Sequence, residues 1–466
     1  MDSNFIWITG GNESYLSMIE VLAKSLLKYS KHKLIVYGFN CNSTIDLPNV
    51  INKRIDYIPK PTVNSTHEPD LFHKDYSIYF AKYLASLDSL EEKYNNFAWI
   101  DGDAFVTENI DTSLQYLSDL KDYPLFMKYF HEDINQWRYY KGIKLEGRYG
   151  NELSSIKNLK RNPNNKLIAT GFYFYDKRSK LFFEKCLEWN KELNQYSVKI
   201  YTDDNAFSEE RVANNVLWEE NKDLDLPITW NNYYSSKDET LVNPYFLKQG
   251  FDVMYDKLTL KPYFIHGPDP SVKPKNAETL NQAFNDYQSK KLMIVSHPDD
   301  ELIFGGAELI KYGSEYKVIC LTNKLNEIRS KEFKKVMEKL NVRSWEMFDY
   351  EDTLTPTQQF DLKDILKSRK WEKIVTHNPI GEYGHPQHKL VFDTILNLTN
   401  DFYVFGKSLQ KLDQNILDVK NNLLTLYTSE APIINQLLTN NGDWFKSNCP
   451  STNYIEHECI EKYDIS

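Results

Sequence analysis

The feature that most restricts the fold of this chain is a regular alternation of apolar runs and helix-like stretches in its C-terminal part. The runs predicted to be strands are 292–296, 316–322, 345–350 and 373–378. The stretches between them that are predicted to be helices are 305–313, 328–340 and 359–368. Strands that alternate with helices form a parallel sheet covered on both faces. We therefore expect a doubly wound α/β domain whose ligand site lies at the carboxyl ends of the strands.

The N-terminal part shows a similar alternation. An apolar strand at 5–9 leads to an expected turn at 10–12 and a helical pattern, and apolar runs follow at 34–39 and 97–100. This order also predicts an α/β sheet with crossover helices. Between the two parts lies a polar stretch with three prolines, which is typical of a spacer between domains. We therefore predict domains at 1–267 and 291–466, joined by a linker at 268–290.

Composition restricts the function. Acidic residues outnumber basic ones by 66 to 56, and the net charge of −10 argues against a nucleic-acid-binding protein. Apolar runs such as 292–295 are far shorter than the roughly 20 residues of a membrane-spanning helix, so no such segment is expected. The first residues lack the pattern of a signal peptide. The five cysteines show no CxxC spacing, which is typical of free thiols. We therefore expect a cytoplasmic protein.

A histidine and three acids follow the predicted strand 292–296 directly, in the sequence His-Pro-Asp-Asp-Glu at 297–301. A polar turn with a helix-capping aspartate would explain one acid, but not three whose mutual repulsion costs free energy. A second polar segment follows strand 373–378 and contains His385 and His388. Two imidazoles and one carboxylate make a three-ligand set that leaves a fourth position for water, which is typical of catalytic zinc. The spacing therefore predicts a metal site.

At these residues the chain from about 290 to 440 resembles the LmbE/PIG-L family of zinc-dependent N-acetylglucosaminyl deacetylases, whose fold is Rossmann-like. The resemblance rests on HPDDE at 297–301, the segment 329–332 and GHPQH at 384–388. The zinc ligands that it implies are His297, Asp300 and His388. One departure is Gln387, which stands where many relatives carry aspartate.

The same resemblance implies the reaction and further roles. The reaction is hydrolysis of an acetamide to acetate and a free amine. Asp299 matches the general base that takes a proton from water, and His385 matches the histidine that stabilises the oxyanion or protonates the amine. Arg329 matches an arginine that contacts the substrate. Cys320 lies within a predicted strand and is interpreted as a core residue rather than a nucleophile.

In the N-terminal part, Asp101-Gly102-Asp103 follows the apolar run 97–100. Two aspartates at i and i+2 of an extended chain project to the same side, and hard divalent cations prefer carboxylate oxygens. An acidic turn after an edge strand is the alternative interpretation. Three further features accompany the pair. The segment Thr9-Gly10-Gly11-Asn12 follows the first strand, and a glycine-broken strand at 169–176 is followed by an acidic segment at 201–205. The third feature is His266, near the end of the run 262–267.

In this order, residues 1–267 resemble a nucleotide-sugar glycosyltransferase of the GT-A type. The resemblance implies a mixed α/β fold and a Mn²⁺ or Mg²⁺ ion held by Asp101, Asp103 and His266. It implies that Gly171 lines the donor sugar and that Asp203 and Asp204 lie near the reacting sugar or the acceptor. The residues that fall where the nucleotide binds are Thr9, Gly10 and Tyr15. The chain departs from related transferases in lacking a Lys-Pro-Trp segment after the histidine, since Lys273-Pro274 comes later and no tryptophan follows.

Together these patterns predict a bifunctional carbohydrate enzyme. One part would transfer a sugar from a nucleotide donor such as UDP-GlcNAc to a glycan or glycoconjugate, and the other would remove an N-acetyl group. Two alternatives stay open. The N-terminal part could be a sugar-binding module without transferase activity, or the chain could be a metal-stabilised scaffold or lectin.

Overall fold

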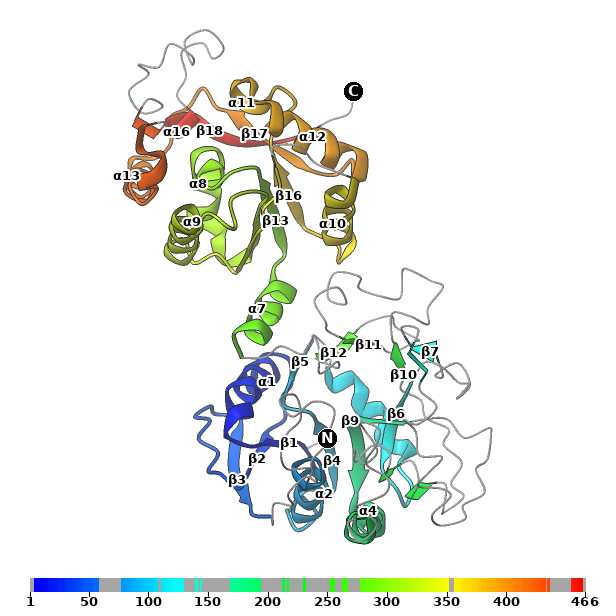
Figure 1. Ribbon diagram of the computed structural model, residues 1–466. Helices are drawn as coiled ribbons and strands as arrows, with labels where there is room; N and C mark the ends of the chain where they lie inside the picture. Colours follow the sequence, from blue (N-terminus) through cyan, green and yellow to red (C-terminus); the bar gives the residue numbers. More distant parts are fainter. Residues whose placement is uncertain are drawn as a thin grey trace, which may run out of the picture. The chain divides into compact units, whose positions relative to one another are not determined.

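The computed structural model describes residues 4–57, 77–107, 110–129, 139–140, 143–144, 168–193, 212–213, 216–217, 229–231, 252–255, 262–266, 277–351, 356–432, 434–435 and 454–463. The chain forms two compact units, Met1–Asn281 and Gln282–Ser466 (Figure 1). None of the helices in these residues is both long enough and apolar enough to cross a membrane.

The C-terminal unit is built on a six-stranded sheet whose order is β15-β14-β13-β16-β17-β18. The first five strands are parallel, and β18 runs antiparallel to β17. The strands are β13 (Lys291–Val295), β14 (Tyr316–Cys320), β15 (Ser344–Met347), β16 (Lys373–Thr376), β17 (Tyr403–Lys407) and β18 (Glu458–Lys462). From β13 the next strands along the chain are added on one side of the sheet, and from β16 onward they are added on the other side, as in doubly wound sheets. The predicted Rossmann-like fold is therefore confirmed.

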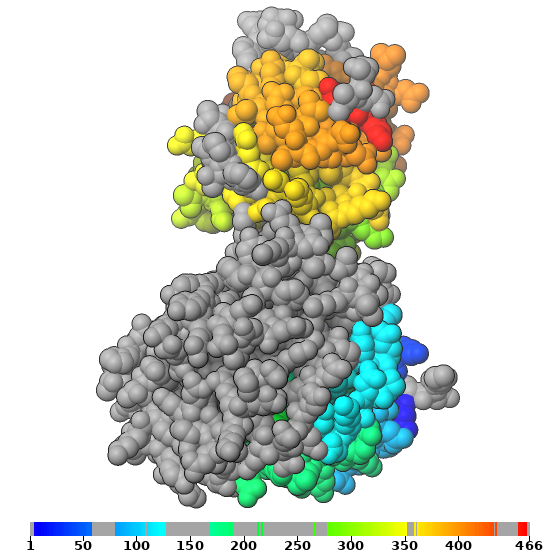
Figure 2. Space-filling model, turned by 90° about the vertical axis from the view of Figure 1, so that its right-hand side faces the viewer, coloured from blue at the N-terminus to red at the C-terminus, as the bar shows by residue number. Residues whose placement is uncertain are grey.

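Helices cover both faces of this sheet (Figure 1). One face carries α8 (Asp300–Tyr312), α9 (Glu327–Lys339) and α13 (Gln414–Leu424), and the other carries α10 (Pro356–Lys367) and α12 (Pro386–Leu398). The yellow and orange surface of the unit in Figure 2 includes α10 and α12. Short helical segments complete the unit, and they are η8 (Gly313–Glu315), α11 (Gly381–Gly384), η9 (Thr428–Glu430) and α16 (Tyr454–His457).

Two local expectations for these helices are wrong. The helix expected at 305–313 begins earlier, at Asp300, because acidic residues in its first turn suit the positive end of the helix dipole. Its glycines lie inside the helix, where a Cβ on Gly305 would meet Met293 Cε at 2.7 Å. In α9, Ile328 is 63% exposed, although the apolar spacing within 328–340 predicts a buried stripe that includes it. It lies five residues before Phe333, which is off the three- and four-residue spacing of a buried helix face.

The N-terminal unit contains a sheet of ten described strands in the order β3-β2-β1-β4-β9-β6-β10-β11-β12-β5. Strands β3, β2, β1 and β4 are parallel, and β9 pairs antiparallel with β4. The strands are β1 (Phe5–Gly11), β2 (Leu34–Phe39), β3 (Val50–Ile55), β4 (Asn96–Ile100), β5 (Ala104–Val106), β6 (Leu125–Tyr129), β9 (Ile168–Asp176), β10 (Thr229–Asn231), β11 (Asp252–Tyr255) and β12 (Pro262–His266). Strands β7 (Tyr139–Tyr140) and β8 (Ile143–Lys144) form a separate pair. The unit is therefore mixed α/β, as predicted.

The turn expected at 10–12 begins later, because Gly10 and Gly11 continue β1 and pair with β2. A side chain on Gly10 would meet the Phe39 ring at 2.6 Å, so glycine here permits a close approach of two strands. Helices among the described residues of this unit include α1 (Leu16–Tyr29), α2 (Ser77–Ser89) and α4 (Lys180–Leu193), with shorter segments η1 (Glu13–Tyr15), η2 (Ile110–Asp119) and η4 (Lys177–Ser179).

Part of the predicted linker is helical, since residues Ala277–Gln288 form α7. Asp286 of this helix is buried and contacts Lys317 Nζ at 2.8 Å and Ser344 Oγ at 3.0 Å. The end of α7 is thus fixed to the N-terminal ends of β14 and β15. The predicted domain boundaries themselves stay predictions.

Candidate metal centres

Three side chains of the C-terminal unit bring their ligand atoms together. His297 follows β13, Asp300 begins α8 and His388 lies in α12. Asp300 Oδ2 lies 3.4 Å from His297 Nδ1 and 3.2 Å from His388 Nε2, and the two imidazole nitrogens are 3.4 Å apart. Tetrahedral zinc with ligands at about 2.0–2.1 Å requires separations of about 3.3–3.4 Å. The three groups therefore fit one zinc ion.

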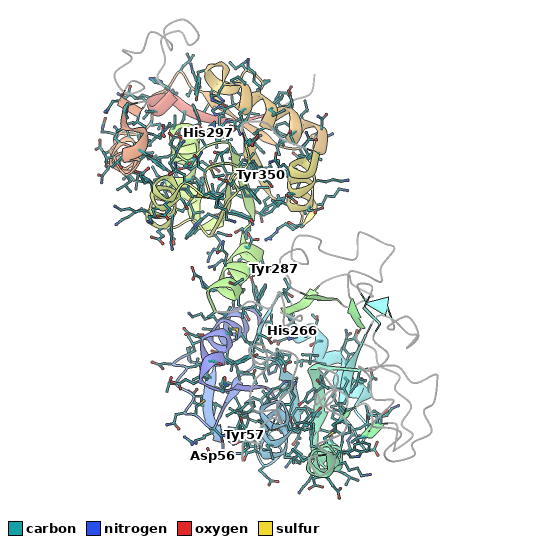
Figure 3. All side chains as sticks on the ribbon, in the orientation of Figure 1. Asp56, Tyr57, His266, Tyr287, His297 and Tyr350 are labelled. Atoms are coloured by element: carbon teal, nitrogen blue, oxygen red, sulfur yellow. The ribbon has the colours of Figure 1, made fainter. Side chains whose placement is uncertain are left out.

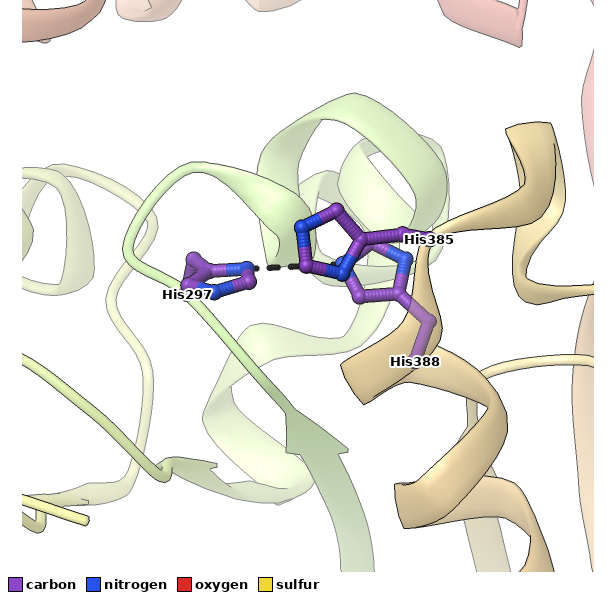
Figure 4. A group of neighbouring side chains, drawn as sticks. All are labelled: His297, His385 and His388. Carbon is purple, nitrogen blue, oxygen red and sulfur yellow. Dashed lines mark hydrogen bonds between the residues drawn. The ribbon is translucent and has the colours of Figure 1, made fainter. Parts of the chain in front are cut away.

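The parallel sheet explains this meeting of residues that are about ninety positions apart. The loops after β13 and β16 leave the sheet at the point where its strand order reverses, which is where such sheets bind ligands. Figure 4 shows the rings of His297 and His388 approaching one another from these two segments, with His385 beside them. The backbone of Asp299 has φ 111°, which turns the chain sharply between His297 and the start of α8.

The electrostatics of the group favour a cation. Burial opposes protonation of His388, but the neighbouring Asp300 and Glu382 outweigh it and raise the pKa of His388 to about 10. Burial likewise opposes ionisation of Asp300, yet the adjacent histidines hold its pKa well below the usual range. The site thus attracts positive charge strongly. A metal ion would take the place of the proton on His388 Nε2.

Asp299 and His385 flank the three ligands. Asp299 is buried, and this burial together with Asp300 raises the pKa of its carboxyl well above the usual value. His385 caps α12, and its Nδ1 accepts a hydrogen bond from the Gln387 backbone N–H at 3.3 Å. This contact places the ring proton on Nε2, which can then donate to a substrate oxygen. The centroids of the His385 and His297 rings are 5.0 Å apart.

Arg329 contacts the same loop from α9. Its Nη2 donates to the carbonyl oxygen of Pro298 at 2.9 Å, and Nη1 lies 3.4 Å from Glu430 Oε1. The guanidinium therefore supports the backbone that carries Asp299. Its predicted contact with substrate stays a prediction.

Several residues that support the site were not predicted from the sequence. Glu382 Oε2 lies 2.6 Å from His388 Nδ1 and 3.0 Å from His377 Nδ1. Glu301 accepts hydrogen bonds from the Asp299 N–H and, over 126 residues, from the Tyr427 hydroxyl at 2.6 Å. Burial raises the pKa of Glu301 to about 7. The third acid of the 299–301 run was a signal for Glu301, whereas Glu382 lies in a glycine-containing segment that resembled a simple loop.

A second group lies in the N-terminal unit and contains Asp101, Asp103 and His266. His266 ends β12, next to β5, and is labelled in Figure 3. Its Nε2 lies 3.1 Å from Asp103 Oδ1 and 3.8 Å from Asp101 Oδ2. Carboxylate and imidazole donors in this arrangement suit Mn²⁺, and the carboxylates suit Mg²⁺.

The surroundings of Asp101 are also polar. Its Oδ1 accepts hydrogen bonds from Trp99 Nε1 at 2.7 Å and from Lys82 Nζ at 3.1 Å. A Cβ on Gly171 would lie 3.4 Å from Asp101 Oδ2 and 3.5 Å from the His266 ring. The glycine therefore leaves space beside the acidic pair.

The other predicted residues of this unit are placed as follows. Thr9 is fully buried at the carboxyl end of β1, and Gly10 follows it in the same strand. Because β1 is parallel to β4, this end faces the same sheet edge as Asp101. Tyr15 packs against Gly11. Asp203 and Asp204 lie outside the described residues, as does Lys273.

Comparisons with known proteins agree with part of this picture. Residues 292–399 match the family GlcNAc-PI de-N-acetylase (PIG-L). The uncharacterized protein L374 of Acanthamoeba polyphaga mimivirus is 33% identical over 171 residues, a match that covers 32% of this chain and 75% of that protein.

Three solved structures are partly similar. The N,N'-diacetylchitobiose deacetylase from Pyrococcus horikoshii is 18% identical, with a TM-score of 0.29 over 38% of this chain and 86% of the other. The bifunctional glycosyltransferase WbbM is 15% identical, with a TM-score of 0.30 over 47% of this chain and 38% of the other. The glycosyltransferase GlyE from Streptococcus pneumoniae TIGR4 is 12% identical, with a TM-score of 0.30 over 85% and 90%.

Proposed function

The chain belongs to the same family as the mimivirus protein and carries a PIG-L deacetylase domain at its C-terminal end, and from this premise we propose that its C-terminal unit is a zinc-dependent hydrolase of N-acetylhexosamines. The observation that carries the proposal is the set of three ligand-atom separations of 3.2–3.4 Å among His297, Asp300 and His388. These separations match a tetrahedral ion with one position left for water.

The side chains around the ligands suit amide hydrolysis. A zinc ion at this position would polarise the acetamide carbonyl and make water a stronger acid. Asp299 would then accept the proton of the attacking water and pass it to the departing amine. His385 Nε2–H would donate a hydrogen bond to the oxygen that becomes negatively charged as the carbonyl carbon is attacked. Acetate and a free amino sugar are the products.

Two measurements test this proposal. The purified chain should contain about one zinc per molecule, measured by elemental analysis, and should release acetate from N-acetylglucosamine or a glycoside of it. A chelator should stop acetate release, and added zinc should restore it. A chain that binds zinc but releases no acetate from any N-acetylhexosamine derivative would contradict the proposed reaction.

The Asp101, Asp103 and His266 group supports a second activity for the N-terminal unit. We propose transfer of a hexose or N-acetylhexosamine from a nucleotide sugar such as UDP-GlcNAc, with Mn²⁺ or Mg²⁺. A cation at these three residues would offset the negative charge of the leaving diphosphate. The acceptor would be a glycan or glycoconjugate. UDP release from UDP-sugars in the presence of Mn²⁺ measures this activity.

The two activities would act in sequence, with the acetyl group removed from the sugar just transferred. A tether raises the effective concentration of one site's product near the other to about the millimolar range. If the rate of acetate release from UDP-GlcNAc and acceptor is the same whether or not UDP is released, deacetylation does not depend on transfer, and the proposed order of the two reactions is wrong. If Asp101→Asn changes no glycan product, the N-terminal unit is instead a sugar-binding module without transferase activity.

A further inference from the structure

Glu382 contacts two imidazoles with a single carboxylate oxygen. Its Oε2 lies 2.6 Å from His388 Nδ1 and 3.0 Å from His377 Nδ1. Its other oxygen, Oε1, accepts the backbone N–H of Asn378 at 2.9 Å. The side chain is fully buried, so these contacts are not shared with bulk water. A carboxylate only accepts hydrogen bonds, and therefore both imidazoles donate to it through Nδ1.

His377 transmits this contact to the other ligand-bearing loop. Its Nε2 accepts the backbone N–H of Ser296 at 2.9 Å, and Ser296 directly precedes His297. The His377 ring therefore holds its proton on Nδ1, facing Glu382. Glu382, His377 and Ser296 form a continuous chain of hydrogen bonds from the loop after β16 to the end of β13.

The same contacts decide which of the two histidines can bind the metal. The rings of His377 and His388 are stacked, with centroids 3.8 Å apart and planes inclined by 20°. Their Nε2 atoms lie 3.6 Å and 3.2 Å from Asp300 Oδ2, so both face the ligand group. The Nε2 lone pair of His377 is already used by Ser296. That of His388 is directed toward Asp300 and His297, where the ion would lie.

The backbone at Glu382 gives an independent indication that its side chain is needed. Its φ of 52° and ψ of −67° are close to the rare γ-turn with positive φ, which is strained for any residue with a Cβ. Glycine would adopt this conformation at lower free-energy cost. Strained positions of this kind cluster at functional sites.

From these contacts we propose that Glu382 is a positioning residue that aligns both halves of the zinc site. It fixes the Nδ1-protonated tautomer of His388, which leaves Nε2 free for zinc, and through His377 it holds the strand end that carries His297. The proposal rests on the proposed zinc-dependent function. Removal of a carboxylate that accepts a hydrogen bond from a metal-binding histidine typically weakens metal binding by about 10- to 100-fold.

Two substitutions at this position test the proposal in different ways. In Glu382→Gln, the amide NH₂ must face either the Asn378 N–H or the two imidazole Nδ1 atoms. In the first orientation, the amide NH₂ and the Asn378 N–H would be two donors facing each other. In the second, the amide NH₂ would face the imidazoles, and His388 would have to carry its proton on Nε2 instead of Nδ1. In Glu382→Gly, the backbone strain is relieved while the carboxylate is lost. Glu308→Gln is the matched control, because Glu308 bonds Tyr316 and Lys373 at the far end of α8.

The experiment measures zinc affinity of the full chain by competition with a chromogenic chelator, and the visible absorption of the Co²⁺-substituted protein. We expect both Glu382 variants to fold, to bind zinc about 10- to 100-fold more weakly and to change the Co²⁺ bands, while Glu308→Gln binds as the wild type does. Wild-type affinity in either variant overturns the proposal. If Glu382→Gln does not fold, Glu382→Gly carries the test, because its backbone is less strained.

The same data separate this proposal from the proposed function. A wild-type chain that binds zinc and releases no acetate contradicts the deacetylase function but leaves the affinity comparison valid. Full acetate release together with unchanged zinc affinity in the variants contradicts only the role of Glu382. A wild-type chain that binds no zinc overturns both.

Discussion

The two candidate metal centres are both made of three side chains, but they differ in how completely the chain prepares them. In the C-terminal unit, all three ligand atoms lie within 3.4 Å of one another. In the N-terminal unit, His266 is 3.1 Å from Asp103 but 3.8 Å from Asp101, whose side chain is 24% exposed. The first group is thus compact and enclosed, and the second is open on one side.

Their supporting contacts differ in the same direction. Glu382 accepts hydrogen bonds from Nδ1 of His388 and Nδ1 of His377, and the Ser296 N–H occupies Nε2 of His377. The Nε2 lone pair of His388 therefore stays directed toward the zinc position. In the N-terminal unit, Lys82 and Trp99 donate hydrogen bonds to Asp101 itself, and the Lys82 ammonium partly offsets its negative charge. Mg²⁺ sites commonly use one or two carboxylates and take further oxygens from substrate phosphates. From this comparison we expect the C-terminal centre to bind the proposed zinc ion without a substrate, and the N-terminal centre to bind its proposed ion together with a diphosphate.

The largest effect should follow removal of a zinc ligand. His388→Ala should lose zinc and lower acetate release by about a thousandfold or more, because the ion contributes several kcal/mol and 1.36 kcal/mol is a factor of ten. Elemental analysis and an acetate assay measure the two quantities. His457→Gln is a control, since His457 lies in α16 outside the ligand group. Retention of zinc by His388→Ala would contradict the ligand assignment.

Asp299→Asn should separate catalysis from metal binding. The variant should retain zinc and lose about 100- to 1,000-fold in acetate release, as expected for removal of a general base. Asparagine is chosen because it tolerates a positive φ such as the 111° found here. If activity falls only in proportion to zinc content, Asp299 acts as a ligand rather than as the base.

In the N-terminal unit, Asp103→Asn should lower UDP release by about 100-fold and leave acetate release from a simple N-acetylhexosamine unchanged. The expected loss is smaller because the diphosphate supplies part of the coordination. Prolonged dialysis sharpens the comparison, since UDP release should then require added Mn²⁺ while acetate release should not. A requirement of both activities for the same added ion would contradict the distinction between the two centres.

The sequence alone predicted the elements on which the C-terminal centre depends. One apolar run is followed directly by His297-Pro298-Asp299-Asp300, and the loop after another contains the segment 384–388. A parallel sheet brings the ends of neighbouring strands, and the loops that follow them, together. His266 could likewise be proposed as a partner of Asp101 because it follows a short apolar run. Such features can be predicted from the sequence because they depend only on hydrophobic periodicity and on the direction of the chain.

The supporting contacts could not be predicted in the same way. The bond from Tyr427 to Glu301 and that from Ser296 to His377 join segments that the sequence separates by 126 and 81 positions. Whether Glu382 points into the site depends on a backbone conformation that its residue type disfavours. Trp99 lies within the expected strand 97–100, but the sequence does not indicate that its ring nitrogen donates to Asp101 Oδ1 at 2.7 Å. Such contacts depend on side-chain direction, which hydrophobic periodicity does not encode.

Trp99→Phe should give a moderate effect that tests the support of Asp101. The phenyl ring keeps the packing against Phe39 and Tyr173 but lacks the N–H that Asp101 Oδ1 accepts. Hydrogen bonds to charged groups contribute about 1.5–3 kcal/mol, so the Mn²⁺ concentration for half-maximal UDP release should rise at least about tenfold. Trp189→Phe, at a buried tryptophan of the same hydrophobic core, is the matched control. An unchanged Mn²⁺ requirement would indicate that Lys82 alone orients the carboxylate.

The smallest effects should come from two glycines that serve the two centres differently. Gly384, with φ 96° and no heavy atom within 4 Å of an added Cβ, is needed for backbone conformation, whereas Gly171 leaves space next to Asp101 and His266. Gly384→Ala should therefore lower the free energy of unfolding by about 1 kcal/mol, measured by urea denaturation. Gly171→Ala should leave stability nearly unchanged and weaken nucleotide-sugar binding severalfold in a titration, because its methyl group would occupy the open side of the acidic pair. If Gly171→Ala instead lowers stability and leaves nucleotide-sugar binding unchanged, this glycine is needed for backbone conformation rather than for ligand space.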